Sequence, residues 1–378
     1  MKIQRIAVLP QGFKANGLSA GIKKSRKPDL ALFYSLISAK AGCVVTANKV
    51  KAAPLVVNQE HLRKAKNFQA IIVNSGNANC FTGSAGIKDA QDTAGILSRE
   101  LDLKKESVLV ASTGIIGRRL PLDKIKRSIP ELVRGLSAGG IVKAKKAILT
   151  TDIITKEITL EFNIGDSAVK ICGIAKGSGM IAPNMATMLG FIFTDARISQ
   201  KALDKALRSA VDNSFNCITV DGCMSTNDTV IILANGAARN KLINSGKEFD
   251  LFQEALNIVC LELAKLIIRD GEGATKFITI KVSGARSLKE AKQAGLAIAN
   301  SNLFKTAIFG ENPNFGRVAA SIGSAGVSFN ENKLKVFLSP LNKKIVRVKV
   351  DLFAGRFSST IYTCDLSPEY IKINAAYN

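Results

Sequence analysis

Residues 157–195 have the sequence EITLEFNIGDSAVKICGIAKGSGMIAPNMATMLGFIFTD, and this stretch decides the fold class. Apolar and polar residues alternate from Glu157 to Asn163, which is the period of a strand with one buried face. Gly165 and Asp166 follow as turn residues, so the stretch begins as a β-hairpin. The hairpin leads through a glycine-rich loop into an apolar run at 188–194, which predicts a buried strand.

Further strand signals lie on both sides of the hairpin. Runs rich in apolar and β-branched residues predict strands at 42–50 and 107–114, and within 70–83, where a strand leads into a Gly/Asn loop. The last third of the chain adds strands at 344–355 and 357–366.

Helix signals separate these strands. One helix is expected at about 87–101, and Ser199 precedes an amphipathic helix. Asp250 begins a capping box before a helix at 251–269, and Ser287 begins another. Strands and helices that mix without a regular βαβ alternation predict an α/β fold of mixed α+β type, built from layered sheets rather than a barrel. We expect one unit spanning residues 1–378.

The composition is that of a globular protein with a large core. The chain has 378 residues, of which 47% are hydrophobic and 22% charged. No apolar run reaches the roughly 18 residues of a membrane span, and the N-terminus lacks the apolar segment of a signal peptide. We therefore expect a soluble, cytoplasmic protein.

Cysteine and histidine usage limits the chemistry. Seven scattered cysteines form no Cys-x-x-Cys pair, which indicates free, mostly buried thiols. The one histidine, His61, lies in a polar stretch and is expected at the surface, and no metal site is expected. A Ser-His-Asp or Cys-His mechanism would depend on His61, so a nucleophile in this chain needs another base.

The formal net charge of +23 raises the question of a nucleic-acid partner. The basic residues are dispersed, and the short clusters at 23–27 and 117–120 lack interleaved aromatic residues. Neither nucleic acid nor a membrane is expected as a partner. The positive field could still collect small anionic substrates.

The glycine-rich stretch 176–195 has two interpretations. It can be an ordinary loop that enters a core strand, since threonine is common at strand starts. Alternatively, Thr187 is a functional hydroxyl placed just before that strand. A P-loop is excluded, because Lys176 precedes the glycines and no Gly-Lys-Ser/Thr follows.

Ordered motifs along almost the whole chain favour the second interpretation. They are GFKANGLSAGIKKSRKPDLAL (12–32), ANKVKAAP (47–54), VNSGNANCFTG (73–83), ASTGIIG (111–117), LTTD (149–152), AKGSGMIAPNMATML (175–189), STNDT (225–229), RDGEGATKF (269–277), NPNFGR (312–317) and INAAY (373–377). In these motifs the chain resembles the ornithine acetyltransferase family, also called the bifunctional glutamate N-acetyltransferase family of arginine biosynthesis. The resemblance implies that family's layered αββα-type sandwich.

The resemblance also implies self-cleavage between Ala186 and Thr187, giving an alpha chain of residues 1–186 and a beta chain of residues 187–378. The physical logic is consistent with this, because a threonine hydroxyl can attack the preceding carbonyl to form an ester that water hydrolyses. Scission frees an α-amine on the nucleophile itself. Since an α-amine has a pKa near about 8, it can supply the base that histidine does not.

The activity implied is transfer of acetyl from N2-acetyl-L-ornithine to L-glutamate through an acetyl-Thr187 intermediate, releasing L-ornithine and forming N-acetyl-L-glutamate. By resemblance, Thr113 and Gly114 form the oxyanion hole. The substrate contacts implied are Thr150, Lys176, Thr187, Glu272 and Asn374. No cofactor is expected, and acetyl-CoA is a candidate co-substrate that some family members use.

The family's assembly implies a heterotetramer of two alpha and two beta chains. The chain departs from the family pattern at its end, because it stops at Asn378, directly after Tyr377, where relatives commonly carry further polar residues. Two other functions stay open on the residues alone. One is a self-processing aminopeptidase or amidase of similar architecture, and the other is a non-catalytic basic binding protein.

Overall fold

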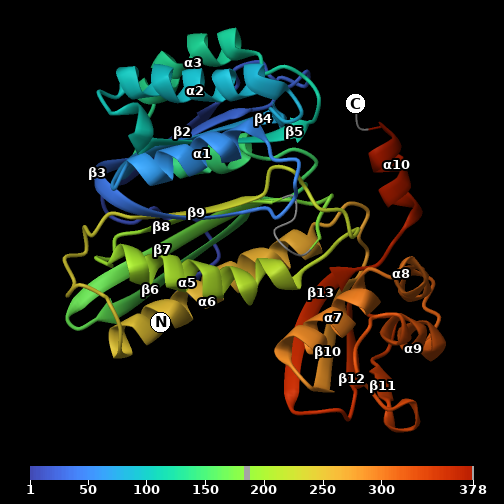
Figure 1. Ribbon diagram of the computed structural model, residues 1–378. Helices are drawn as coiled ribbons and strands as arrows, with labels where there is room; N and C mark the ends of the chain where they lie inside the picture. The colour runs from blue at the N-terminus through green and yellow to red at the C-terminus, as the bar shows by residue number, and fades with distance from the viewer. Residues whose placement is uncertain (183–187, 377–378) are drawn as a thin grey trace. The chain divides into compact units, whose positions relative to one another are not determined.

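Two units make up the chain, and they alternate along the sequence (Figure 1). Unit 1 comprises Met1–Gly177, Thr187–Ser214 and Ser225–Leu263, and unit 2 comprises Ser178–Ala186, Phe215–Met224 and Ala264–Asn378. The computed structural model describes residues 1–182 and 188–376. Neither unit matches the expected fragments 1–186 and 187–378, since each unit draws on both. The cleavage of a single 1–378 unit into those fragments stays a prediction.

The long strand β3 (Leu30–Val45) joins two sheets in unit 1. Its first part pairs with β2 and β4, and Lys40–Val45 pairs with β9. The strand order is β1-β6-β7-β8-β9-β3-β4-β5. The strand β2 pairs with β3 on the edge opposite β4. The remaining strands of unit 1 are β1 (Lys2–Gln4), β2 (Phe13–Leu18), β4 (Phe68–Asn77), β5 (Val108–Ile115), β6 (Lys156–Ile164), β7 (Ser167–Lys176), β8 (Leu189–Thr194) and β9 (Thr229–Ala234).

The two sheets enclose an apolar core. Alternation along β3 points Ala31 and Phe33 to the inside, where the Phe33 ring lies 5.3 Å from that of Phe191 and 5.0 Å from that of Phe193. Aromatic rings at these separations pack favourably. The predicted hairpin is confirmed, because β6 and β7 pair antiparallel. The predicted buried strand is also confirmed, because β8 is buried throughout and lies between β7 and β9.

Helices cover both outer faces of this sandwich, as Figure 1 shows. Leu30 and Leu32 of β3 pack with the helices α1 (Ala53–Lys64), α2 (Gly83–Glu100) and α3 (Leu122–Arg134). The other face carries α5 (Gln200–Asp212) and α6 (Lys247–Arg269), and α4 (Ile141–Ala147) packs beside β2 and β3. The layer order is αββα, so the predicted fold class is confirmed.

Unit 2 has its own four-stranded sheet. The order is β11-β12-β10-β13, with β10 parallel to β12 and antiparallel to β13. Its core collects apolar residues from these strands and from the helices beside them. The elements are β10 (Phe277–Ala285), α7 (Leu288–Ala299), α8 (Asn302–Phe309), α9 (Phe315–Gly323), β11 (Lys335–Leu338), β12 (Ile345–Asp351), β13 (Phe357–Cys364) and α10 (Pro368–Ala376).

Local capping signals give mixed results. Ser199 caps α5 by accepting a hydrogen bond from the Ala202 backbone N–H, and Ser287 caps α7 in the same way through Glu290. The capping box at Asp250 is wrong, because α6 begins at Lys247 and Asp250 lies in its first turn. The predicted strand at 42–50 is also displaced, since β3 ends at Val45.

The expectation for His61 is wrong. His61 is only 2% exposed, and its Nδ1 donates a hydrogen bond of 2.7 Å to the Val108 carbonyl oxygen. The imidazole therefore anchors α1 to the start of β5. The expectation for cysteines is confirmed, since all seven are free, five are buried and only Cys223 is exposed.

Candidate active site

The end of β5 brings Thr113 and Gly114 to the edge of the sandwich. Thr113 is buried, and β5 runs parallel to β4 with Gly114 beside Gly76. Gly114 has φ +133°, and a Cβ there would lie 2.4 Å from the Gly76 carbonyl carbon. Only glycine fits this combination of backbone angle and close approach. The predicted oxyanion-hole pair thus lies at a strand end where position 114 tolerates no side chain.

Lys176 ends β7 in the other sheet and reaches Thr113. Its Nζ lies 3.3 Å from the Thr113 hydroxyl oxygen and 3.8 Å from Asp152 Oδ2, and the residue is only 2% exposed. The structure therefore brings together two predicted residues that are 63 positions apart in the sequence.

Asp152 holds this cluster together. Its Oδ1 accepts hydrogen bonds from Lys156 Nζ at 2.7 Å and from the Gly177 backbone N–H at 2.6 Å, and its Oδ2 accepts one from the Thr150 backbone N–H at 2.9 Å. Burial alone would raise the pKa of Asp152, but the charges of Lys176 and Lys156 outweigh it and hold that pKa below the ordinary value. Thr150 thus lies in the same cluster as Asp152 and Lys176.

Lys23 is a neighbour of this cluster that the sequence analysis missed. Its Nζ donates hydrogen bonds of 2.7 Å to the carbonyl oxygens of Pro28 and Leu149. Its stem passes beside Gly76, where a Cβ would lie 2.9 Å from Lys23 Cγ. Desolvation, helped by the charge of Lys176, lowers the pKa of Lys23 to about 8. Unit 1 therefore holds, beside the predicted residues, a lysine whose pKa is lowered by burial.

Two other predicted residues meet in unit 2. Asn374 Nδ2 donates a hydrogen bond of 2.8 Å to Glu272 Oε2, and the Glu272 backbone N–H donates to the Ser178 carbonyl oxygen at 2.9 Å. A Cβ at Gly179 would lie 2.2 Å from Glu272 Oε2, so the glycine makes room for the carboxylate. Three of the motifs are thereby gathered around Glu272.

Asp221 anchors the segment that follows Gly179, and sequence analysis missed it. Its carboxylate accepts hydrogen bonds from the backbone N–H groups of Met180 at 2.6 Å and Ile181 at 3.0 Å, and from the Tyr370 hydroxyl at 3.2 Å. Burial raises the pKa of Asp221. The stretch that leads toward Ala186 is thus fixed in unit 2 as far as Ile181.

The predicted scissile pair Ala186–Thr187 lies outside the described residues. The first described residue after it, Met188, is buried, and its backbone N–H donates a hydrogen bond of 2.9 Å to Asp228 Oδ1. Leu189 then pairs with Lys176 of β7 and with Thr229 of β9. The chain therefore enters unit 1 next to the strand end that carries Lys176.

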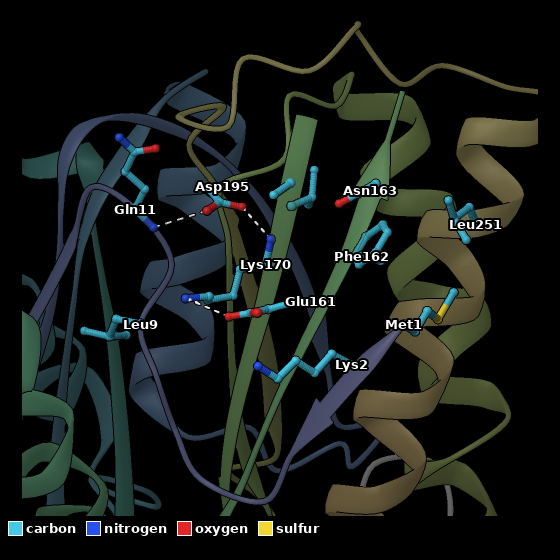
Figure 2. A pocket seen from close by; sticks show the side chains of 12 residues that line it. Met1, Lys2, Leu9, Gln11, Glu161, Phe162, Asn163, Lys170, Asp195 and Leu251 are labelled. Atoms are coloured by element: carbon cyan, nitrogen blue, oxygen red, sulfur yellow. Dashed lines mark hydrogen bonds and ion pairs between the residues drawn. The ribbon is translucent and has the colours of Figure 1, made fainter. Parts of the chain in front are cut away.

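A wide groove of about 1020 Å³ lies elsewhere in unit 1 (Figure 2). At its rim, Asp195 accepts hydrogen bonds from the backbone N–H groups of Gln11 and Lys170, and Lys170 pairs with Glu161. Asp195 follows the last residue of β8, whereas Lys176 pairs with the first. The groove is thus at the opposite end of β8, and none of the predicted site residues that the structure describes lines it.

Comparison with known proteins identifies the family. A profile of the ArgJ family matches residues 14–342. The chain is 46% identical to the arginine biosynthesis bifunctional protein ArgJ of Caldanaerobacter subterraneus, with 98% of this chain and 97% of that protein covered. The ArgJ protein of Geobacter sulfurreducens is 44% identical, with 97% of this chain and 99% of that protein covered. The chain belongs to the ArgJ family.

This membership confirms the resemblance carried by the ordered motifs. A solved structure of ornithine acetyltransferase from Mycobacterium tuberculosis, complexed with ornithine, is 38% identical to this ArgJ-family chain. That match has a TM-score of 0.45 and covers 48% of this chain and 97% of the solved chain.

Residues 1–182 and 188–376 of the ArgJ-family chain contain neither a metal-binding cluster nor a membrane-spanning helix. No group of three or more His, Cys, Asp or Glu side chains in this part could hold a metal ion. No helix there is both long and apolar enough to cross a membrane.

Proposed function

We propose that this ArgJ-family chain is a glutamate N-acetyltransferase that moves acetyl from N2-acetyl-L-ornithine to L-glutamate through an acetyl ester on Thr187. The reaction releases L-ornithine and forms N-acetyl-L-glutamate. Support comes from family membership, from relatives named for arginine biosynthesis, and from the related acetyltransferase that was solved with ornithine. These names favour an acetyltransferase over an aminopeptidase or amidase, which would hydrolyse its substrate instead of transferring acetyl.

The observation that supports this mechanism most is the contact between Lys176 Nζ and the Thr113 hydroxyl. In this proposal the Thr113 hydroxyl and the Gly114 backbone N–H stabilise the oxyanion that forms when Thr187 attacks the acetyl carbonyl. The cation of Lys176 makes that end of β5 favourable for negative charge. Losing one oxyanion donor would raise the barrier by about 3 to 4 kcal/mol.

The substrate contacts follow from charge. Lys176 and Thr150 suit the α-carboxylate of an amino acid, because a lysine ammonium and a hydroxyl both donate hydrogen bonds. Glu272, oriented by Asn374, suits an ammonium group of the substrate.

The nucleophile is generated by the chain itself. The Thr187 hydroxyl attacks the Ala186 carbonyl carbon, the C–N bond breaks, and water hydrolyses the resulting ester to leave a carboxylate on Ala186 and an amine on Thr187. That amine then takes the hydroxyl proton when Thr187 attacks the acetyl donor. We expect two copies of each fragment to assemble as a heterotetramer. Acetyl-CoA is a candidate second acetyl donor.

Intact-protein mass spectrometry of the wild type and of Thr187→Ala tests this proposal. We expect two fragments from the wild type and one full-length chain from the variant. Purified wild type should transfer acetyl from N2-acetyl-L-ornithine to L-glutamate and trap it on Thr187. A wild-type chain that stays whole while transferring acetyl, or that only hydrolyses amides, would contradict the proposal.

A further inference from the structure

A pocket of about 490 Å³ lies in unit 1 where β3 passes from one sheet to the other. Ala39 is the last residue of β3 that pairs with β4, and Lys40 is the first that pairs with β9. Leu62 and Ala65 line the pocket from the end of α1, and Gln200 lines it from the start of α5. None of the predicted site residues that the structure describes lines this pocket.

Basic side chains dominate the lining of the pocket. Lys40, Arg63, Lys66 and Arg208 line it, against one acidic residue, Asp204. Within residues 1–182 and 188–376, none of these four basic side chains forms an ion pair with a carboxylate. A hollow lined by one sign of charge focuses the field and attracts ions of the opposite sign. The pocket is therefore suited to an anion.

The acidic residue and the thiol in the lining do not balance this charge. Asp204 Oδ1 accepts a hydrogen bond of 3.0 Å from Gln200 Nε2, and one carboxylate stands against four basic groups. Burial, together with the charge of Asp204, raises the pKa of Cys43 to about 12, so this thiol stays neutral. The lining keeps an excess of positive charge at neutral pH.

Two of the basic side chains are held at the pocket and still have hydrogen-bond donors to offer. Lys40 Nζ donates to Asn67 Oδ1 at 3.3 Å and to the Lys66 carbonyl oxygen at 3.5 Å, which leaves one of its three donors for a ligand. Arg63 Nε donates to the Gln59 carbonyl oxygen at 3.3 Å, and the four remaining guanidinium N–H donors are left for a ligand.

The pocket also has an apolar side. Cys43, Leu62 and Ala65 are partly buried and pack against the core of the sandwich, so they offer an organic group a surface to cover. The volume falls within the range of roughly 300 to 1,000 Å³ that is typical of small-molecule sites. Among small anionic groups, phosphate concentrates charge, carrying about −1.5 to −2 at neutral pH. Arginine binds phosphate through two parallel hydrogen bonds.

We propose that this pocket binds a small phosphate-bearing organic molecule. The phosphate groups contact the four basic side chains, and the organic part covers Leu62 and Ala65. The lining lies entirely within residues 40–68 and 200–208, so this inference is independent of the proposed acetyl transfer.

Isothermal titration calorimetry at pH 7 and moderate salt tests the proposal, with ADP and citrate as probes. ADP carries phosphates on an organic body, whereas citrate has a similar charge on a small body without phosphate. We expect one saturable ADP site per chain and weaker binding of citrate. The double variant Arg63→Gln with Arg208→Gln should weaken ADP binding about tenfold or more, because two charged donors are lost.

The double variant Arg127→Gln with Arg134→Gln, on α3, is the matched control. It removes the same charge from exposed arginines, and Arg127 Nε donates to the carbonyl oxygen four residues earlier, as Arg63 Nε does. It should change ADP binding less than about twofold, because salt screens charges that lie far from the site.

Four outcomes overturn the inference. They are the absence of saturable ADP binding, citrate binding as tight as that of ADP, unchanged ADP binding in the Arg63 and Arg208 variant, and an equal loss in the α3 control. If that double variant does not fold, Lys66→Gln decides, and it should weaken ADP binding severalfold. Absent acetyl transfer with intact ADP binding would contradict only the proposed function, so the two failures are distinguishable.

Discussion

The negative charge of Asp152 holds Lys156, at the start of β6, and Lys176, at the end of β7, and its removal should destabilise the fold. In Asp152→Asn, the ammonium groups of Lys156 and Lys176 lose a buried counter-charge, which typically costs about 3 to 5 kcal/mol. Urea unfolding at pH 7 would measure this loss. Asp166→Asn, in the exposed β6–β7 turn, is the control and should lie within about 0.5 kcal/mol of the wild type.

At acid pH, the difference in unfolding free energy between the wild type and Asp152→Asn should become smaller. The native pKa of Asp152 is depressed, so its contribution is fully present above the unfolded-state pKa of about 3.9 and is lost as the pH falls toward the native value. We expect the difference in unfolding free energy to be constant from pH 7 to 5 and smaller below pH 4. A difference that does not change with pH would show that Asp152 acts by shape rather than by charge.

Lys23 should make stability depend on alkaline pH. Its native pKa of about 8 lies below the unfolded value of 10.5, so the unfolded chain binds more protons between those values. The contribution of Lys23 to the free energy of unfolding therefore rises with pH between about 8 and 10.5. The unfolding free energy of the wild type should rise relative to Lys23→Met between pH 8 and 10, measured by urea unfolding. Parallel curves for the two proteins would refute this, and the exposed neighbour variant Lys24→Met should follow the wild type.

At single residues, sequence reasoning could name candidates where motifs carried the information, and their roles stay predictions. Thr113, Thr150 and Lys176 were named from separate motifs, and the structure places them in one cluster. Asp228 and Lys23 were missed because they contact residues distant in the sequence, Met188 and Leu149 respectively. His61 was misassigned for the same reason, since its partner is a carbonyl oxygen on β5.

At the scale of elements, the caps of α5 and α7 were predictable because Ser199 and Ser287 act on residues three positions away. The start of α6 was not, because the local signal at Asp250 did not indicate that the helix already begins at Lys247. The hairpin of β6 and β7 was predictable from its period and turn. The pairing of β3 in two sheets was not predictable, because the pairing partners of a strand are set by the whole fold.

The corrected boundary of α6 can be tested against a confirmed cap. Ser287→Ala removes the side-chain acceptor for the Glu290 N–H and should cost about 1 kcal/mol. Asp250→Ala removes only an exposed charge within the first turn of α6 and should cost under about 0.5 kcal/mol. Chemical denaturation of both variants makes the comparison. Equal losses would indicate that Asp250 acts as a cap after all.

For the whole molecule, the interleaving of the chain in unit 1 predicts that self-cleavage leaves the fragments bound to each other. β8 and β9 come from the predicted fragment 187–378, and they lie between β7 and β3, which come from 1–186. Hydrogen-bonded pairs run along both seams, from Ile171–Thr194 to Lys176–Leu189 and from Lys40–Ala234 to Val45–Thr229. Separation would break two strand pairings inside one sheet and expose the aromatic core behind them.

Native and denaturing mass spectrometry of the same cleaved sample tests this. Under denaturing conditions we expect two fragments, and under native conditions complexes whose mass is the sum of both or a multiple of it. Thr187→Ala should give the same native masses from an unbroken chain, less the small difference of the substitution and of the water that scission adds. Free fragments at native pH and moderate salt would contradict the prediction, because a bond broken between Ala186 and Thr187 leaves the β7–β8 and β3–β9 hydrogen bonds unchanged in number.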